Sequence, residues 1–126
     1  YKLDFEVEIK EDASPVTMAD KAADLMISSY LKERFPTYAF LTEESEDTKD
    51  RLNNDFVFIV DPVDGTKDFV AKNDEFATNI ALSYKHEVVV GVTSYSFVNK
   101  IGYVINSCLS AYMIASIILS GFGFLE

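Results

Sequence analysis

The stretch FIVDPVDGTKDF, residues Phe58–Phe69, decides how the chain is interpreted. It continues an apolar run that begins at Val57, and a short run of this kind is typical of a buried strand. Asp61 and Asp64 follow three residues apart, with Pro62 between them. In open α/β sheets, ligands bind beyond the carboxyl ends of the strands. The stretch therefore predicts a strand that delivers two carboxylates to a ligand site.

Two carboxylates at one point repel each other unless a cation neutralises them. Oxygen ligands suit magnesium, which keeps some of its waters for a substrate phosphate to replace. We expect the chain to turn after Pro62, so that Asp64 returns to the side of Asp61. Gly65 lets the backbone approach a ligand, and a helix that begins near Thr66 would offer its amides to an anion. The alternative is an ordinary turn in which Thr66 only caps a helix.

Two further acidic segments precede this stretch. Glu43 and Glu44 follow the apolar residues of YAFLTEES, which predict a second strand, so a carboxylate there can reach the same cluster. Asp20 stands near the start of a predicted helix, where the helix dipole favours a negative charge. Thr17, three residues earlier, completes an imperfect capping box. The simpler interpretations are a solvated acidic loop for the glutamates and plain capping for Asp20.

The remaining patterns predict an α/β fold. Leu3–Ile9 alternates apolar and charged residues, as expected of a half-buried strand. An apolar stripe at helical spacing runs from Thr17 to about Phe35, and Pro36 follows the expected helix end. Two more strands joined by a turn are predicted at Phe76–Tyr84 and Glu87–Tyr95, with the turn at Lys85–His86.

The composition excludes some classes of function. The chain has 126 residues, 48% of them hydrophobic, which is enough for a real core. Eleven Lys and Arg against 21 Asp and Glu give a net charge of -10, which argues against binding nucleic acid through a basic surface. The single cysteine, Cys108, excludes an internal disulfide. No signal-peptide pattern is present at the start, so we expect a cytoplasmic location.

Residues 101–125 contain no charged side chain. By length and apolarity this segment is a candidate membrane span. It also contains Asn106, several serines and three glycines, which favour buried strands instead. We therefore assign residues 1–98 to the main domain and 99–126 to a divergent apolar tail. Membrane association through 101–125, and self-association through a half-covered sheet, are the alternatives.

Four segments together resemble a known family. They are SPVTMAD (Ser14–Asp20), EES (Glu43–Ser45), DPVDGTKDF (Asp61–Phe69) and TNIAL (Thr78–Leu82). In this order they resemble the inositol monophosphatase-like superfamily of lithium-sensitive, magnesium-dependent phosphatases, and within it the 3'(2'),5'-bisphosphate nucleotidase branch. Thr66 differs from the serine typical of the fructose bisphosphatase branch. Lys67 and Asp68 differ from the Thr-Asn typical of the inositol monophosphatase branch.

The resemblance implies the N-terminal part of a layered α/β/α/β/α sugar-phosphatase fold, with a mixed sheet flanked by helices. It implies magnesium, two or three ions in the complete fold, held by Glu43, Asp61, the carbonyl of Val63, and Asp64. The substrate phosphate would lie against Glu43, Val63, Asp64, Gly65 and Thr66.

The resemblance also implies a catalytic pair: Asp20 would accept the hydroxyl proton of Thr66, and Thr66 would orient the nucleophilic water. The implied reaction removes the 3'-phosphate of a small phosphorylated nucleotide, adenosine 3',5'-bisphosphate, and gives AMP and phosphate. An inositol or sugar phosphate is the alternative substrate. In the family a second half supplies another metal-binding aspartate and most of the nucleotide pocket, so a catalytically incomplete fragment that binds metal or phosphate is a further alternative.

Overall fold

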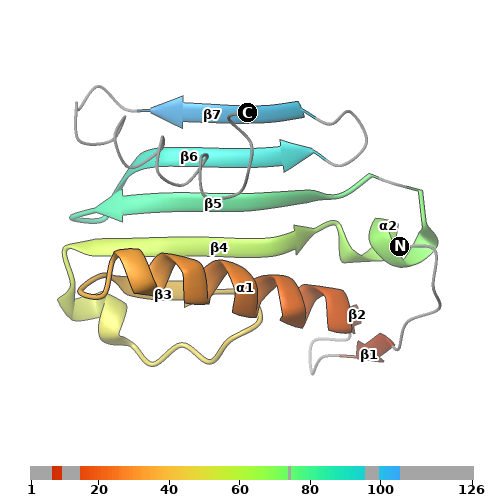
Figure 1. Ribbon diagram of the computed structural model, residues 1–126, viewed down its shortest axis with the longest axis horizontal. Helices are drawn as coiled ribbons and strands as arrows, with labels where there is room; N and C mark the ends of the chain where they lie inside the picture. The colour runs from red at the N-terminus through yellow and green to blue at the C-terminus, as the bar shows by residue number, and fades with distance from the viewer. Residues whose placement is uncertain (1–6, 10–14, 74, 96–99, 106–126) are drawn as a thin grey trace.

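The computed structural model of the protein describes residues 7–9, 15–73, 75–95 and 100–105. Its centre is a five-stranded sheet in the order β3-β4-β5-β6-β7, with helix α1 lying against it and a two-stranded ribbon, β1-β2, beside the start of that helix (Figure 1). Within these residues β3 and β4 are parallel and the other pairs are antiparallel, so the expected mixed sheet is confirmed. The strands are β1 (Val7–Ile9), β2 (Pro15–Thr17), β3 (Ala39–Thr42), β4 (Phe56–Asp64), β5 (Ala77–Tyr84), β6 (Glu87–Tyr95) and β7 (Lys100–Ile105).

Helix α1 (Met18–Arg34) begins with the predicted capping box. The Thr17 hydroxyl oxygen accepts from the amide of Ala19 at 3.1 Å, and the Asp20 carboxylate accepts from the amide of Thr17 at 2.8 Å. Both interactions satisfy groups that a helix end otherwise leaves without partners. The helix ends at Phe35, whose amide still donates to a helical carbonyl. The helix predicted from Thr17 to about Phe35 is therefore confirmed.

The core lies between α1 and one face of the sheet. Ile27 and Leu31 stand one turn apart on the same face of α1, and both are buried. They pack on the inward side chains of four strands, among which Phe58 is fully buried. Burying each such side chain stabilises the fold by about 1.5–3 kcal/mol relative to exposure. This packing fixes α1 so that its first turn lies toward the carboxyl end of β4, near α2 (Thr66–Ala71) (Figure 1).

Strand β4 differs from the expectation that the chain turns after Pro62. It continues to Asp64, pairing with β5, and the ladder shifts its register between Asp61 and Asp64. The shift has a physical cause, because Pro62 has no amide hydrogen for the ladder. The Pro62 carbonyl instead accepts from the hydroxyl of Thr78 at 2.8 Å. The prediction of a turn after Pro62 was therefore wrong: an irregular strand carries the chain to Asp64.

The N-terminal ribbon is a second difference. Of the strand predicted at Leu3–Ile9, Val7–Ile9 lies within the described residues and forms β1. Its partner β2 occupies Pro15–Thr17, a segment in which the sequence predicted no strand. Three residues leading into a helix cap carry too short an alternation to be recognised as a strand.

The hairpin of β5 and β6 is confirmed, with its turn at Lys85 and His86. Both turn residues have positive φ, 50° and 69°. Two consecutive residues with positive φ are typical of the type I′ turn that best joins two twisted strands. The turn therefore sets the register of the hairpin without a glycine.

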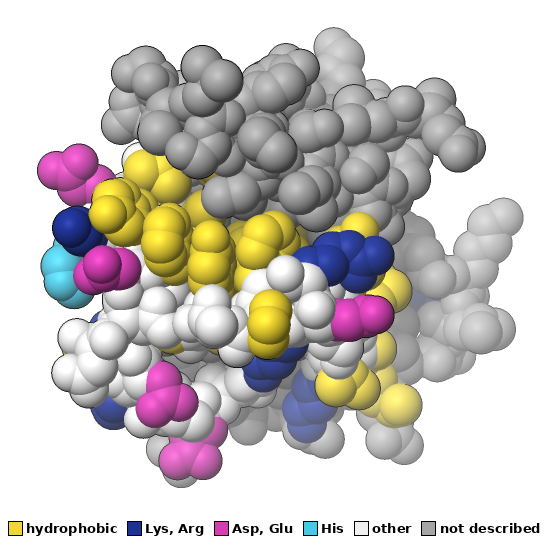
Figure 2. Space-filling view, turned by 60° about the vertical axis from the view of Figure 1, so that its left-hand side comes forward, with side chains coloured by type: hydrophobic (Ala, Val, Ile, Leu, Met, Phe, Trp, Pro, Cys, Tyr) yellow, Lys and Arg dark blue, Asp and Glu magenta, His cyan; other side chains and the backbone are white. Residues whose placement is uncertain are grey.

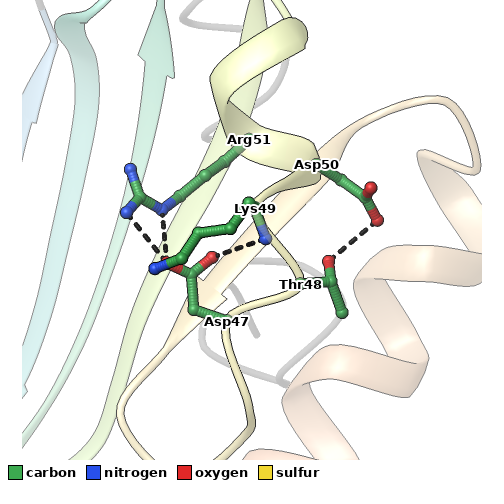
Figure 3. A network of polar contacts seen from close by, with 5 residues as sticks. All are labelled: Asp47, Thr48, Lys49, Asp50 and Arg51. Carbon is green, nitrogen blue, oxygen red and sulfur yellow. Dashed lines mark hydrogen bonds and ion pairs between the residues drawn. The ribbon is translucent and has the colours of Figure 1, made fainter.

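The charged segment between β3 and β4 is held together by its own side chains and contains the short 3-10 helix η1 (Asp50–Asn53). Asp47 accepts from Lys49 Nζ at 2.8 Å and from two guanidinium nitrogens of Arg51 at 2.8 and 3.0 Å (Figure 3). These hydrogen bonds hold the pKa of Asp47 well below its usual range. The bond from Arg51 has the larger effect, and the bond from Lys49 the next largest. Ion pairs thus organise a segment that the sequence predicted only as exposed and charged.

The predicted apolar tail is described in part. Lys100–Ile105 forms β7, which pairs antiparallel with β6, and residues 106–126 lie outside the described residues. Within the described part of the chain, no helix is both long and apolar enough to cross a membrane.

On the face drawn in Figure 2, hydrophobic side chains gather in one band and acidic side chains are scattered. Self-association stays a prediction that light scattering would test.

Candidate active site

Glu43 and Asp61 meet where the parallel pairing of β3 and β4 ends. Thr42, the last residue of β3, pairs with Val60 of β4, and the amide of Glu43 donates to the Val60 carbonyl at 3.1 Å. Glu43 follows the end of β3 and Asp61 follows Val60 within β4, so the two residues are neighbours. Parallel strands place such residues at the same sheet edge, where α/β folds bind their ligands.

Asp61 lies in an unusual electrostatic environment. Burial, a hydrogen bond with Glu43, and the negative charges of Glu43 and Asp64 together raise the pKa of Asp61 to about 7. Its Oδ1 atom is buried and has no hydrogen-bond partner among the described residues. A buried carboxylate oxygen without a donor, next to a second carboxylate, fits a hard cation such as magnesium. The residues present are therefore compatible with that metal.

Asp64 and Val63 have partners of their own. Asp64 Oδ2 accepts from the side-chain amide of Asn79 at 3.0 Å, and the Val63 carbonyl accepts from the Thr66 hydroxyl at 3.1 Å. Among the described residues, no group of three or more His, Cys, Asp and Glu side chains comes together as a metal-binding cluster. The structure thus joins Glu43 to Asp61, and it holds Asp64 beside this pair through Asn79.

Asp20 and Thr66 meet although they are 46 residues apart in the sequence. The Thr66 hydroxyl donates to Asp20 Oδ1 at 3.0 Å, while Asp20 Oδ2 accepts from the amide and the hydroxyl of Thr17. Asp20 is only 1% exposed, so water does not compete for these bonds. The hydrogen of the Thr66 hydroxyl points at protein oxygens, which leaves its oxygen lone pairs to accept a hydrogen bond from another group.

Gly65 joins β4 to α2 in a conformation that glycine alone adopts without strain. Its φ is +93°, and a β-carbon added there would lie 3.0 Å from the carbonyl oxygen of Glu75. The residue also forms the N-cap of α2, which begins at Thr66. The Thr66 hydroxyl contacts the Val63 carbonyl, and the Val63 backbone also hydrogen-bonds Asp61, so Thr66 and Asp61 share a neighbour near the end of β4.

Two residues near this site were not predicted as part of it. Asn79 is the partner of Asp61 in the β4–β5 ladder and holds Asp64. Asp24 is buried at 4% exposure on α1. Its position one helical turn after Asp20 was a usable signal, because residues four apart share a helix face. Asn79 belongs to the segment TNIAL that carries part of the resemblance, but its bond to Asp64 depends on the strand register opposite Asp61, which a short sequence window does not show.

A surface pocket of about 570 Å³ lies along β3 and the loop after it. It is lined by side chains such as Lys32, Phe40 and Asn54, and by none of the predicted site residues. The chemistry of the carboxylates and the Asp20–Thr66 pair, rather than the size of this hollow, therefore locates the candidate site.

The mixed sheet, the helix that covers one face, and the acidic edge beside α2 define the N-terminal part of the layered α/β/α/β/α sugar-phosphatase fold. The chain belongs to the Inositol monophosphatase family, whose model matches residues 1–109.

Known proteins agree with this assignment. The chain is 41% identical over 95 residues to the 3'(2'),5'-bisphosphate nucleotidase CysQ of Salmonella typhimurium, a match that covers 75% of this chain and 38% of that protein. Among solved structures, the extragenic suppressor protein suhB of Bartonella henselae matches with a TM-score of 0.74 and 32% identity, over 82% of this chain and 40% of that one. An IMPase/NADP phosphatase solved with Mg²⁺ and phosphate shares the fold, with a TM-score of 0.75, 22% identity and coverage of 82% and 40%.

The matches cover only part of these relatives. The chain spans 27% to 38% of the length of the first two curated proteins it matches. The family and the fold are therefore established, whereas the activity of the longer relatives comes to this chain as a proposal.

Proposed function

We propose that the chain carries the first half of a magnesium-dependent phosphomonoester hydrolysis site. The proposed reaction removes the 3'-phosphate of adenosine 3',5'-bisphosphate and gives AMP and phosphate. The observation that carries the proposal is the buried Asp61 oxygen without a donor, placed beside Glu43. The Asp20–Thr66 hydrogen bond at the start of α2 supports it. The sequence similarity to a 3'(2'),5'-bisphosphate nucleotidase, 41% identity over 95 residues, supports this choice of substrate.

Four groups of the chain would hold magnesium: the carboxylates of Glu43, Asp61 and Asp64, and the carbonyl of Val63. Magnesium bound there would supply positive charge against the negative charge that develops on the phosphoryl oxygens. Asn79 limits where the Asp64 carboxylate can turn, because its side-chain amide already donates to Oδ2. Val63 O retains a second lone pair beside the one used by the Thr66 hydroxyl.

Thr66 would orient the attacking water. Its hydroxyl hydrogen is directed to Asp20 Oδ1, so its oxygen can accept a hydrogen bond from a water near the substrate phosphorus. Asp20 would fix this polarity, since a buried carboxylate accepts hydrogen bonds and does not donate them when ionised. The amides at the start of α2, which lack helical acceptors, would bind the phosphate next to Gly65. These steps need no histidine or cysteine nucleophile.

Two alternatives have specific support. An inositol or sugar phosphate is a candidate substrate, because the family that matches residues 1–109 is that of the inositol monophosphatases. A metal- and phosphate-binding chain without turnover is the other, because the chain spans well under half of the curated relatives. A water-soluble phosphorylated nucleotide as the substrate fits a cytoplasmic location, which we propose with it.

Phosphate release would test the proposal. The chain is incubated with adenosine 3',5'-bisphosphate or inositol 1-phosphate, with magnesium or with EDTA, beside Asp61→Asn and the control Glu33→Gln, whose site on α1 is 81% exposed. We expect magnesium-dependent release from the nucleotide that Asp61→Asn abolishes and Glu33→Gln retains. Release from the inositol phosphate alone would favour the first alternative. Magnesium binding without release from either compound would favour the second, and release that survives in EDTA would contradict the metal-dependent mechanism.

A further inference from the structure

Asp24 binds the turn that carries the two glutamates. Its Oδ2 accepts from the Ser45 hydroxyl at 2.5 Å and from the Thr42 hydroxyl at 3.4 Å. Its Oδ1 accepts from Ser28, one helical turn further along α1, at 3.4 Å. The bond from Ser45 is the shortest of the three, and the other two lie near the upper limit of hydrogen-bond length.

The same oxygen of Asp24 holds both ends of this turn. Thr42 and Ser45 flank Glu43 and Glu44, and the amide of Ser45 also donates to the Thr42 hydroxyl oxygen at 3.1 Å. The amide of Glu43 donates to the Val60 carbonyl. The backbone on either side of Glu43 is therefore fixed by contacts to α1 and to β4.

Asp24 and Asp20 act alike on two different segments. They lie one helical turn apart on the buried face of α1, at 4% and 1% exposure. Asp20 accepts from Thr66, which follows β4, and Asp24 accepts from Thr42 and Ser45, which end β3 and follow it. One face of one helix thus holds both segments that contribute to the candidate site.

We propose that Asp24 is a positioning residue for the candidate metal site: through Ser45 it holds the turn at Glu43 and Glu44 so that Glu43 faces Asp61. Removal of this contact lets the turn move and lowers metal affinity, although Asp24 itself touches no metal. Outer contacts that orient metal ligands typically change affinity by about 10–100-fold when they are removed. The proposal rests on the proposed function in one respect, namely that Glu43 binds the metal.

The chain offers a matched set of variants. Ser45→Ala removes the short bond to the turn, and Ser28→Ala removes a bond to the same carboxylate that stays within the helix. Asp24→Ala removes both acceptor oxygens and all three hydrogen bonds. Asp24→Asn keeps one oxygen for the turn, while the Ser28 hydroxyl can rotate to accept from the new amide. A general loss of α1 stability would make Ser28→Ala behave like Ser45→Ala.

Two measurements on the full chain test the proposal. Hydrogen exchange in EDTA follows the amides of Glu43 and Ser45, and calorimetric titration with magnesium chloride follows affinity. We expect exchange at both amides to be about tenfold faster in Ser45→Ala and Asp24→Ala, and within about twofold of the parent in Ser28→Ala and Asp24→Asn. Magnesium affinity should fall about tenfold in the first two variants and be retained in the others.

The two measurements separate the possible failures. If the parent chain does not bind magnesium, the proposed function fails, and the exchange comparison still decides whether Asp24 positions the turn. If Ser45→Ala leaves both amides and magnesium affinity within about twofold of the parent, the positioning role is overturned. If Ser28→Ala changes them as much as Ser45→Ala does, Asp24 is a structural residue of α1 only.

Discussion

Asp20 provides the sharpest test of how the helix and the site are joined. Its carboxylate accepts the Thr17 amide at 2.8 Å and the Thr66 hydroxyl at 3.0 Å, in a position that is 1% exposed. In Asp20→Ala the Thr17 amide loses its acceptor, which costs about 1–3 kcal/mol for a buried donor. Loss of the charge at the start of α1 adds about 0.3–1 kcal/mol. The Thr66 hydroxyl can still donate to the Val63 carbonyl, so the loss of its bond to Asp20 adds little to the cost in stability.

We therefore expect Asp20→Ala to lower the free energy of unfolding by about 3 kcal/mol. Asp20→Asn should lower it by only about 1 kcal/mol, because its oxygen can serve the Thr17 amide and its NH₂ group can donate to Thr66. The same substitution reverses the polarity of the Thr66 hydroxyl bond. Any phosphatase activity should therefore fall much more than stability does.

Urea unfolding followed by far-UV circular dichroism measures these losses, since the chain contains no tryptophan. Glu33→Ala, at an exposed acidic position on the same helix, is the control and should change stability by less than about 0.5 kcal/mol. If Asp20→Ala and Glu33→Ala lower stability equally, the argument from buried hydrogen bonds is refuted.

Three further predictions follow from backbone and charge. Gly65→Ala should destabilise the fold by about 1–3 kcal/mol in urea unfolding, because φ is +93° and the added β-carbon meets the Glu75 carbonyl; an unchanged midpoint would contradict this. His86→Gly should raise the thermal midpoint, since a φ of 69° suits glycine better; a lower midpoint would mean that the imidazole makes a stabilising contact. In EDTA, the raised pKa of Asp61, about 7, means that its folded form binds a proton more tightly than the unfolded chain does. The stability from this effect is present below about pH 4 and lost as pH rises through 7, so the parent should lose more stability than Asp61→Asn between pH 5 and pH 8; equal losses would contradict the pKa assignment.

Much of the fold followed from local patterns in the sequence. The capping box at Thr17 and Asp20, the helical stripe and the β5–β6 hairpin depend on neighbours a few residues apart, and each was predicted correctly. The continuation of β4 through Pro62 was not, because it depends on the Thr78 hydroxyl of another strand. A proline after an apolar run reads locally as a turn.

For the candidate site, too, some contacts were predicted from the sequence and others were not. The motif predicted that Asp20 would meet Thr66 and that Glu43 would lie near Asp61, and the structure has both contacts. Their roles in metal binding and catalysis stay predictions. The contacts of Asp24 depend on how α1 lies over β3, which is set by core packing and not by any local pattern. Sequence reasoning thus found the groups that would do chemistry and missed one that holds them in place.

Magnesium binding tests the central claim most directly. Isothermal titration of the chain with magnesium chloride, beside Asp61→Asn and Glu33→Gln, asks whether the carboxylate pair of Glu43 and Asp61, with its buried Asp61 Oδ1 atom, binds a cation. The account predicts saturable binding in the parent and in Glu33→Gln, and its loss in Asp61→Asn. Binding of equal affinity in all three proteins, or no binding in the parent, would contradict it.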